Sequence, residues 1–289
     1  MSGKKRTVRL LTWLGVAAVL VWTFAPLYWL LLSSLSTRVQ LLSTPLRWVR
    51  LHPTLQNYRM IMDMSNGTGE RFIYAFRNTL IIGLSVTVIC VLLGSLAAYA
   101  VARLKVPGKN GIVLVTLATR MLPTIALVIP FYVIEVAVLP RFFGLNLFDT
   151  KTNLIVLYSS FILGLVVWIM RGYFASIPRE LEEAARIDGC SPLQAFYHVV
   201  VPLAMPGLVA TALLSFLMAV DDFILALLFT RTENAFTMPY FIYTLGGQFL
   251  HEYNQVAAAG VVASLPPVLL ALFLGRKIVS GLTSGGVKG

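Results

Sequence analysis

Charged side chains are scarce in this sequence: they make up 12% of its 289 residues, whereas 58% are hydrophobic. Soluble globular domains carry about 25% charged residues, so the shortage indicates a membrane protein surrounded by lipid. The formal net charge is nevertheless +11. No basic run alternates with aromatic residues as in proteins that bind single-stranded nucleic acid, so we expect no nucleic-acid partner. Basic loops of this kind orient apolar helices in a membrane instead.

Side chains that commonly carry catalysis are also rare. The two cysteines, Cys90 and Cys190, and the three scattered histidines form no spacing typical of a disulfide, a metal site or a nucleophile–base pair. The sequence also lacks the GxxxxGK[S/T] pattern of a phosphate-binding loop. We therefore expect a chain that is not an enzyme and that holds no ATP, metal or other cofactor itself.

Long apolar runs dominate what remains. A run of about 20 apolar residues is long enough to cross a bilayer as a helix. Six runs predict six transmembrane helices in a single all-α domain, over residues 10–32, 76–102, 112–139, 153–170, 208–230 and 256–274. The first run is too long for the apolar core of a signal peptide. Between and after these runs lie an outer loop at 36–74, a polar segment at 173–206 and a tail at 275–289.

Basic residues predict the orientation of these helices. Lys4, Lys5, Arg6 and Arg9 precede the first run, and the loop at 103–109 contains three basic residues within seven positions. Cytoplasmic loops are enriched in Lys and Arg, so we expect the N-terminus on the cytoplasmic side. Six spans then place the C-terminus and the 173–206 segment on that side too.

The polar segment reads as two short helices. Pro178 suits a first helical position, the glutamates that follow favour the positive end of the helix dipole, and Gly189 suits a left-handed helix end. Ser191 then starts a second helix as its N-cap, and Pro202 and Pro206 end it. One face of this second helix is expected to carry Leu193, Phe196, Tyr197 and Val200.

This segment resembles a known motif. Glu183-Ala184-Ala185-Arg186-Ile187-Asp188-Gly189, followed by Ser191, Phe196, Pro202, Leu203, Pro206 and Gly207, is similar to the EAA motif of ABC importer permeases. Further stretches resemble maltose-type carbohydrate permeases across nearly the whole chain: Pro53–Tyr58, Arg77–Leu80, Ala97–Arg103 and Gly281–Gly289. One position departs from the family pattern, because Cys190 stands where alanine is usual.

The resemblance implies a subunit of a sugar importer in a bacterial or archaeal cytoplasmic membrane. Its partners would be a second, homologous permease, two ATPase subunits that bind ATP and Mg²⁺, and an external sugar-binding protein. The sugar would be a disaccharide, an oligosaccharide or a polyol. The 173–206 segment would then be a coupling-helix pair that docks on an ATPase through Glu183, Ala184, Ala185, Asp188, Gly189, Phe196 and Pro202.

Arg120, Asp221 and Asp222 are charged residues that fall inside apolar runs. Charges at membrane depth cost about 2.5–3.5 kcal/mol on insertion scales, so we expect them in the bundle interior or in a cavity. Two hypotheses stand side by side. In the first, Arg120 forms a structural pair with Asp221 or Asp222, or these charges pair with a partner permease. In the second, the aspartates accept hydrogen bonds from sugar hydroxyls. Tyr132 and Tyr243 are candidates for stacking on sugar rings in the same path, although tyrosines also gather at membrane interfaces.

Two other functions remain open on the sequence alone. Arg120 and the aspartates would also serve a proton relay in an ion-coupled transporter, which needs no ATPase. A membrane scaffold without transport activity would require the polar segment alone.

Overall fold

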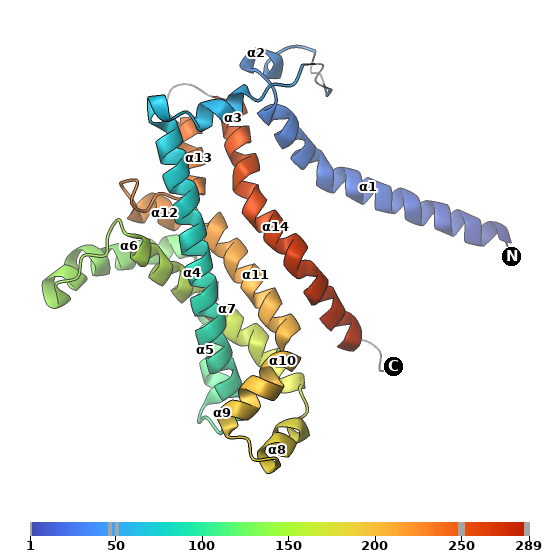
Figure 1. Ribbon diagram of the computed structural model, residues 1–289, viewed down its shortest axis with the longest axis vertical. Coiled ribbons are helices and arrows are strands. Elements are labelled where there is room, and N and C mark those ends of the chain that lie inside the picture. Colours follow the sequence, from blue (N-terminus) through green and yellow to red (C-terminus); the bar gives the residue numbers. More distant parts are fainter. Residues whose placement is uncertain (1, 46–47, 50–51, 248–251, 286–289) are drawn as a thin grey trace. The chain divides into compact units, whose positions relative to one another are not determined.

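The computed structural model describes residues 2–45, 48–49, 52–247 and 252–285 (Figure 1). Within these ranges the regular elements are helices and there is no strand, which confirms the predicted all-α fold class. The chain divides into two compact units: Met1–Ile73 with Phe241–Ser264, and Tyr74–Tyr240 with Leu265–Gly289.

The described residues contain five helices long and apolar enough to cross a membrane: Thr7–Ser34, Thr68–Arg103, Thr124–Phe143, Lys151–Ser176 and Tyr253–Gly275. A sixth candidate is the pair Pro192–Leu203 and Met205–Asp221, whose axes differ by 76°. These lengths and compositions establish a multi-pass membrane protein with five or six spans.

Two of the expected spans contain a break. The 112–139 run forms α5 (Lys109–Ala118), η2 (Thr119–Met121), α6 (Thr124–Val133) and the π-helical η3 (Ile134–Phe143). Leu122 is extended at ψ 124° because the ring of the following Pro123 disfavours helical backbone there. The 208–230 run forms α11 (Met205–Asp221) and α12 (Ile224–Phe229), with Asp222 extended between them.

The first unit is organised around a buried asparagine. It contains α1 (Ser2–Ser34), α2 (Arg38–Leu41), α3 (Gln56–Ile61) and η1 (Met64–Asn66), together with parts of α4 (Thr68–Arg103), α13 (Met238–Gly247) and α14 (Tyr253–Gly285). Asn57 is 2% exposed and donates from Nδ2 to the carbonyls of Ser34 (2.7 Å) and Ser36 (2.8 Å). Asn254 Nδ2 donates to Asn57 Oδ1 at 2.5 Å. One amide thereby joins the end of α1 and the start of α14 to α3.

Two further features complete this unit. The apolar side chains of α1 are exposed over most of its length, as expected for a helix that meets lipid or another subunit. At η1, Asp63 accepts hydrogen bonds from the backbone N–H and the hydroxyl of Ser65. These bonds, the backbone one first, lower the pKa of the Asp63 carboxyl below its usual value.

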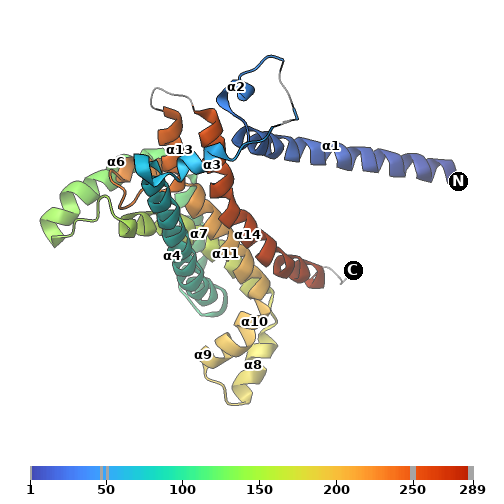
Figure 2. The same ribbon diagram turned by 45° about the horizontal axis from the view of Figure 1, so that its top comes forward.

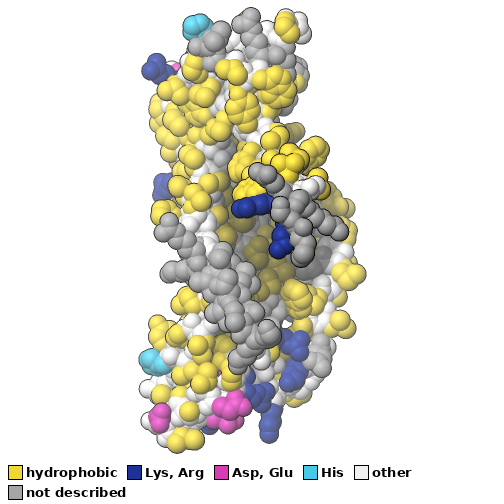
Figure 3. Space-filling model, turned by 90° about the vertical axis from the view of Figure 1, so that its right-hand side faces the viewer, with side chains coloured by type: hydrophobic (Ala, Val, Ile, Leu, Met, Phe, Trp, Pro, Cys, Tyr) yellow, Lys and Arg dark blue, Asp and Glu magenta, His cyan; other side chains and the backbone are white. Residues whose placement is uncertain are grey.

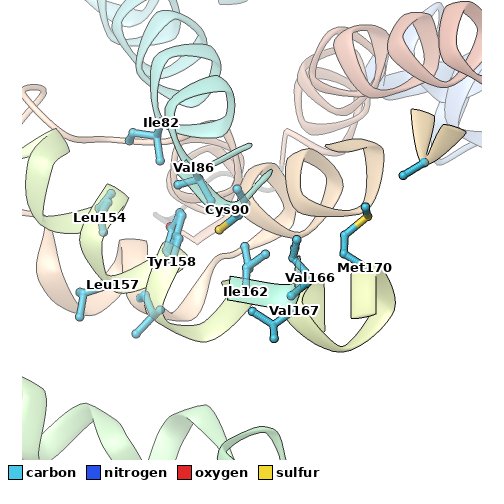
Figure 4. Close-up of a cluster of buried hydrophobic side chains, with 14 of the residues drawn as sticks. Ile82, Val86, Cys90, Leu154, Leu157, Tyr158, Ile162, Val166, Val167 and Met170 are labelled. Atoms are coloured by element: carbon cyan, nitrogen blue, oxygen red, sulfur yellow. The ribbon is translucent and has the colours of Figure 1, made fainter. Parts of the chain in front are cut away.

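The second unit is built around α7 (Lys151–Ser176). This helix packs against α5, α11 and α12, and its side chains supply much of one hydrophobic cluster. Figure 4 shows Leu154, Tyr158, Ile162 and Val166 of α7 near Val86 and Cys90 of α4. The Cys90 side chain is fully buried in this cluster.

The turn between α12 and α13 is fastened to its neighbours by polar contacts. Asn78 of α4 donates to the carbonyls of Glu233 (2.9 Å) and Phe236 (3.1 Å), and Thr79 Oγ1 accepts from the Met238 N–H (2.8 Å). Lys151 Nζ, at the start of α7, donates to the Asn234 carbonyl at 2.7 Å. Asp149 accepts from the backbone N–H groups of Arg231 (2.8 Å) and Thr232 (3.0 Å). This turn therefore connects α4 with α7.

Candidate functional site

The first short helix of the polar segment is α8 (Arg179–Ile187). Its first turn carries Glu180 and Glu182 and its last turn Arg186, so the charges oppose the helix dipole at each end. Pro178 occupies the N-cap and Arg179 is the first helical residue, so the helix begins one position later than predicted.

A Schellman motif ends α8. Gly189 has φ +95°, its N–H bonds to the Arg186 carbonyl (3.2 Å), and the Cys190 N–H bonds to the Ala185 carbonyl (3.0 Å). The left-handed conformation expected of Gly189 is confirmed. This glycine reverses the chain between the two short helices because it has no Cβ that would disfavour a positive φ.

The second short helix starts as expected and then changes its winding. Ser191 caps α9 (Pro192–Ala195) in a capping box with Gln194, which confirms the predicted N-cap. A π-helical turn, η4 (Phe196–Val200), and α10 (Val201–Leu203) follow. The helix thus runs through Pro202 to Ala204 before it bends into α11, and Pro206 lies in the first turn of α11.

The predicted apolar face of this second helix is wrong in part. Phe196 and Val200 are buried, whereas Leu193 and Tyr197 are 71% and 67% exposed. The π-turn is the physical reason, since its wider winding shifts the register that a regular helix of 3.6 residues per turn would have. Leu193 and Tyr197 consequently belong to the outer surface of the segment.

Phe196 anchors the segment to the spanning helices. Its ring lies 4.5 Å from that of Tyr99 on α4 and 6.0 Å from that of Phe174 on α7, centroid to centroid. Tyr99 and Phe174 also contact each other edge to face at 5.9 Å. Aromatic pairs at these distances add about 0.5–1.5 kcal/mol beyond the area they bury.

Most of the other predicted coupling residues lie on the outside. Glu183, Ala184, Asp188, Gly189 and Pro202 are exposed, and Ala185 is half-buried. Ile187, between them, is 85% exposed. Figure 2 shows α8 and α9 beyond the ends of α10 and α11, and Figure 3 shows Asp and Glu side chains gathered at the lower end of the molecule, where α8 lies. The segment thus offers an acidic and apolar surface outside the second unit's core.

A second feature lies where the two helix breaks of this unit meet. A cavity of about 110 Å³ is bordered by Thr119 and Leu122 from the break after α5 and by Asp222 from the break after α11, together with Tyr158 of α7. Irregular backbone at membrane depth is tolerated where it is buried in protein or lines a cavity. Both interruptions therefore lie where a membrane protein tolerates irregular backbone.

Asp222 is half-buried at this cavity and Asp221 is exposed beside it. Asp222 Oδ1 accepts from the Leu225 N–H at 2.9 Å, which caps α12. The Tyr158 hydroxyl, on a side chain 2% exposed, donates to the Asp222 carbonyl at 3.4 Å. One acidic side chain thus both starts a helix and faces the cavity.

Tyr132, another path candidate, does not border this cavity. The ring of Tyr132 packs against Phe148 (5.8 Å) and Phe229 (6.3 Å), so it fills space between helices. Tyr243 is 53% exposed on α13, in the first unit. The backbone of Arg120 lies in η2, and its side chain lies outside the described part of the structure, as does any pairing with Asp221 or Asp222.

Sequence reasoning missed Glu135. It lies in η3, is 4% exposed, and accepts a hydrogen bond from the Asn153 side chain at the start of α7. The signal was a lone carboxyl within the apolar 112–139 run, of the same kind as Arg120. Its partner is distant in sequence, and only the fold reveals it.

Comparison with known proteins relates this arrangement to membrane transport. Residues 64–284 match the model of the family described as "Binding-protein-dependent transport system inner membrane component". The trehalose transport system permease protein SugB of Mycobacterium tuberculosis is 44% identical over 82% of this chain and 82% of its own. The trehalose/maltose transport system permease protein MalG of Thermococcus litoralis is 35% identical over 97% of each chain.

A solved structure agrees in fold. A chain of a bacterial ABC transporter involved in the import of the polysaccharide alginate superposes with a TM-score of 0.76, covering 96% of this chain and 98% of its own at 20% identity. The family match covers well over half of the sequence, and relatives of more than 30% identity span most of it. The chain therefore belongs to the family of inner-membrane components of binding-protein-dependent transport systems.

Proposed function

We propose that this chain is a permease subunit of an ATP-driven sugar importer, coupled to a separate ATPase through residues 173–206. The observation that carries the proposal is the exposed α8–α9 surface on a helical membrane unit. Ile187 is 85% exposed there, next to exposed Glu183 and Asp188. Fully burying such an aliphatic side chain contributes about 1.5–3 kcal/mol, so a partner that covers it gains affinity. The sugar transporters among the relatives support the class of substrate.

The partners follow from the same proposal. A second, homologous permease completes the pathway, two ATPase subunits bind ATP and Mg²⁺, and an external binding protein delivers the sugar. The family's dependence on binding proteins supports the last partner. The N- and C-termini then lie in the cytoplasm together with α8, in keeping with the basic loop at 103–109.

The substrate path in this subunit includes the cavity beside Asp222. Its volume of about 110 Å³ is well below the roughly 300–1,000 Å³ of pockets that enclose whole ligands. A disaccharide would not fit inside it. We infer that Asp222 meets a sugar hydroxyl from the cavity wall as the sugar passes, and that the external binding protein sets most of the selectivity.

The direct test reconstitutes the complete complex in vesicles with its ATPase and binding protein. Sugar uptake is expected to continue when an ionophore collapses the proton gradient, as long as ATP is supplied. It is expected to stop when the ATPase carries a substitution that blocks hydrolysis. Uptake that ends with the proton gradient and persists with the inactive ATPase would instead establish the ion-coupled alternative. Assembly without any uptake would establish a scaffold.

A further inference from the structure

We propose that Arg103 is a positioning residue that fixes the joint between α7 and α8, so that α8 moves together with the spanning helices α4 and α7. The proposal deepens the coupling function proposed above and rests on it. Arg103 is the last residue of α4, and its side chain is 5% exposed. Nη2 donates to the Ile177 carbonyl at 2.6 Å, and Nε lies 3.5 Å from Glu182 Oε1.

The two groups that Arg103 contacts, a carbonyl and a carboxylate, lie at the facing ends of two helices. Ile177 is the C-cap of α7, and Glu182 lies in the first turn of α8. A cation is favourable at a helix C-terminus and a carboxylate at an N-terminus, so each charge also matches its helix dipole. Only Pro178 separates Ile177 from α8, and its ring fixes φ. One guanidinium group therefore spans the joint at which the chain turns from the membrane span to the coupling helix.

Tyr99 adds a second contact from the same face of α4. Residues 99 and 103 are four positions apart, which places them one above the other on a helix. The Tyr99 ring packs on Phe196 of η4, and its hydroxyl interacts with the Glu182 side chain. α4 thus holds the joint through Arg103 and the second short helix through Tyr99.

The Arg103–Glu182 ion pair is better suited to fixing the orientation of α8 than to increasing the folding stability of the protein. A buried ion pair recovers little more than the cost of removing its charges from water, whereas loss of one partner leaves the other uncompensated. Glu182 is only 13% exposed, and its Oε1 and Arg103 Nε have no hydrogen-bond partner in the described structure, so at 3.5 Å electrostatic attraction holds them. The planar fork of arginine reaches both helix ends at once, which the single ammonium of lysine does not.

The test uses the intact complex with Arg103→Gln, Arg103→Lys and Glu182→Gln. Lys105→Gln is the matched control, because Lys105 carries the same charge two residues later and is exposed. We measure sugar imported per ATP hydrolysed and the amount of ATPase that copurifies. Arg103→Gln is expected to lower the sugar-to-ATP ratio about tenfold or more while the ATPase stays bound. Arg103→Lys is expected to fall between Arg103→Gln and the wild type.

A purely structural role predicts a different result. It would reduce the amount of assembled complex and leave the ratio per complex unchanged, and this outcome would overturn the proposal. Glu182→Gln keeps the size of the side chain and the Arg103–Ile177 bond, so it tests the joint even if Arg103→Gln does not assemble. A normal sugar-to-ATP ratio in Glu182→Gln would also overturn the proposal.

A distance measurement tests the joint without transport. Spin labels on native Cys190, three residues after α8, and on Lys105→Cys report the distance between the end of α8 and the end of α4. Cys90 stays unlabelled because it is fully buried. We expect a narrow distribution in the wild-type background and a broad one with Glu182→Gln. Equal widths would contradict the positioning role. If the wild-type complex fails to import sugar, the proposed function is wrong, while this measurement still decides whether Arg103 fixes the joint.

Discussion

Gly189 is the single residue on which the shape of the coupling segment depends most. Its φ of +95° lies outside the range that side chains with a Cβ readily adopt, and its N–H closes the end of α8. Gly189→Val should therefore cost about 1–3 kcal/mol locally and displace α9 from α8. We expect reconstituted complexes to hydrolyse ATP but import little sugar.

Gly111→Val is the control for that substitution, because Gly111 lies on α5 with open space around it. Its sugar-to-ATP ratio should match that of the wild type. Normal coupling in Gly189→Val would show that the reversal between α8 and α9 is not needed for docking.

Asp222 offers a prediction about the substrate path. Asp222→Asn keeps an oxygen that can accept from the Leu225 N–H, so α12 should retain its cap and the subunit should assemble. The negative charge at the cavity is lost, and we expect sugar uptake per assembled complex to fall about tenfold, since hydrogen bonds to charged groups contribute roughly 1.5–3 kcal/mol. Poor assembly with unchanged uptake per complex would favour a structural role.

At the scale of helices, the contact between α7 and α11 depends on a glycine. A Cβ placed on Gly207 would lie 2.5 Å from the ring of Tyr173, closer than two carbon atoms can approach. Gly207→Ala should therefore destabilise the packing of these helices by about 1–3 kcal/mol. The measurement is the thermal unfolding midpoint of the purified protein in detergent.

The same helix pair provides the control. Gly172 lies one residue before Tyr173 on α7, and a Cβ there meets no atom within 4 Å. Gly172→Ala should leave the midpoint unchanged or raise it, because alanine favours helix more than glycine by about 1 kcal/mol. Equal destabilisation by both substitutions would argue against a steric cause.

The ends of the short helices could be predicted from the sequence because local chemistry decides them. Gly189 ends α8 through its backbone preference, and Ser191 starts α9 through its side chain. The π-turn at Phe196–Val200 could not be predicted from the sequence. It depends on the packing of Phe196 against Tyr99 and Phe174, which lie far away along the chain. A proline such as Pro123 disfavours helix at the residue before it, but it does not indicate that this break would face the one at Asp222 across a cavity.

At the scale of the whole molecule, the two native cysteines report the proposed orientation. Cys190 is half-buried in the coupling segment and Cys90 is fully buried in the second unit. A maleimide that does not cross membranes should label the chain in inside-out vesicles and not in right-side-out ones. Cys190→Ser should abolish the labelling, and bound ATPase should slow it. Labelling from the outside would reverse the predicted topology.

The stretches that resemble sugar permeases have a structural explanation at this scale. Asn57, in the Pro53–Tyr58 stretch, joins three helices of the first unit, and Asn78 and Thr79 hold the turn between α12 and α13. Arg103, the end of another such stretch, bridges α7 and α8. The sequence shows that these polar residues exist, but their partners are 20 to 200 positions away and appear only when the chain is folded.

The contacts at the two ends of α4 and α7 limit how these helices can move. Asn78 and Lys151 bind the same turn at one end, and Arg103 binds the Ile177 carbonyl at the other. On both helices the tied positions are about 38 Å apart at 1.5 Å per residue, close to the full thickness of a bilayer. Sliding one helix along the other by a single residue would break the contacts at both ends at once. Any rearrangement that preserves them must move α4 and α7 together.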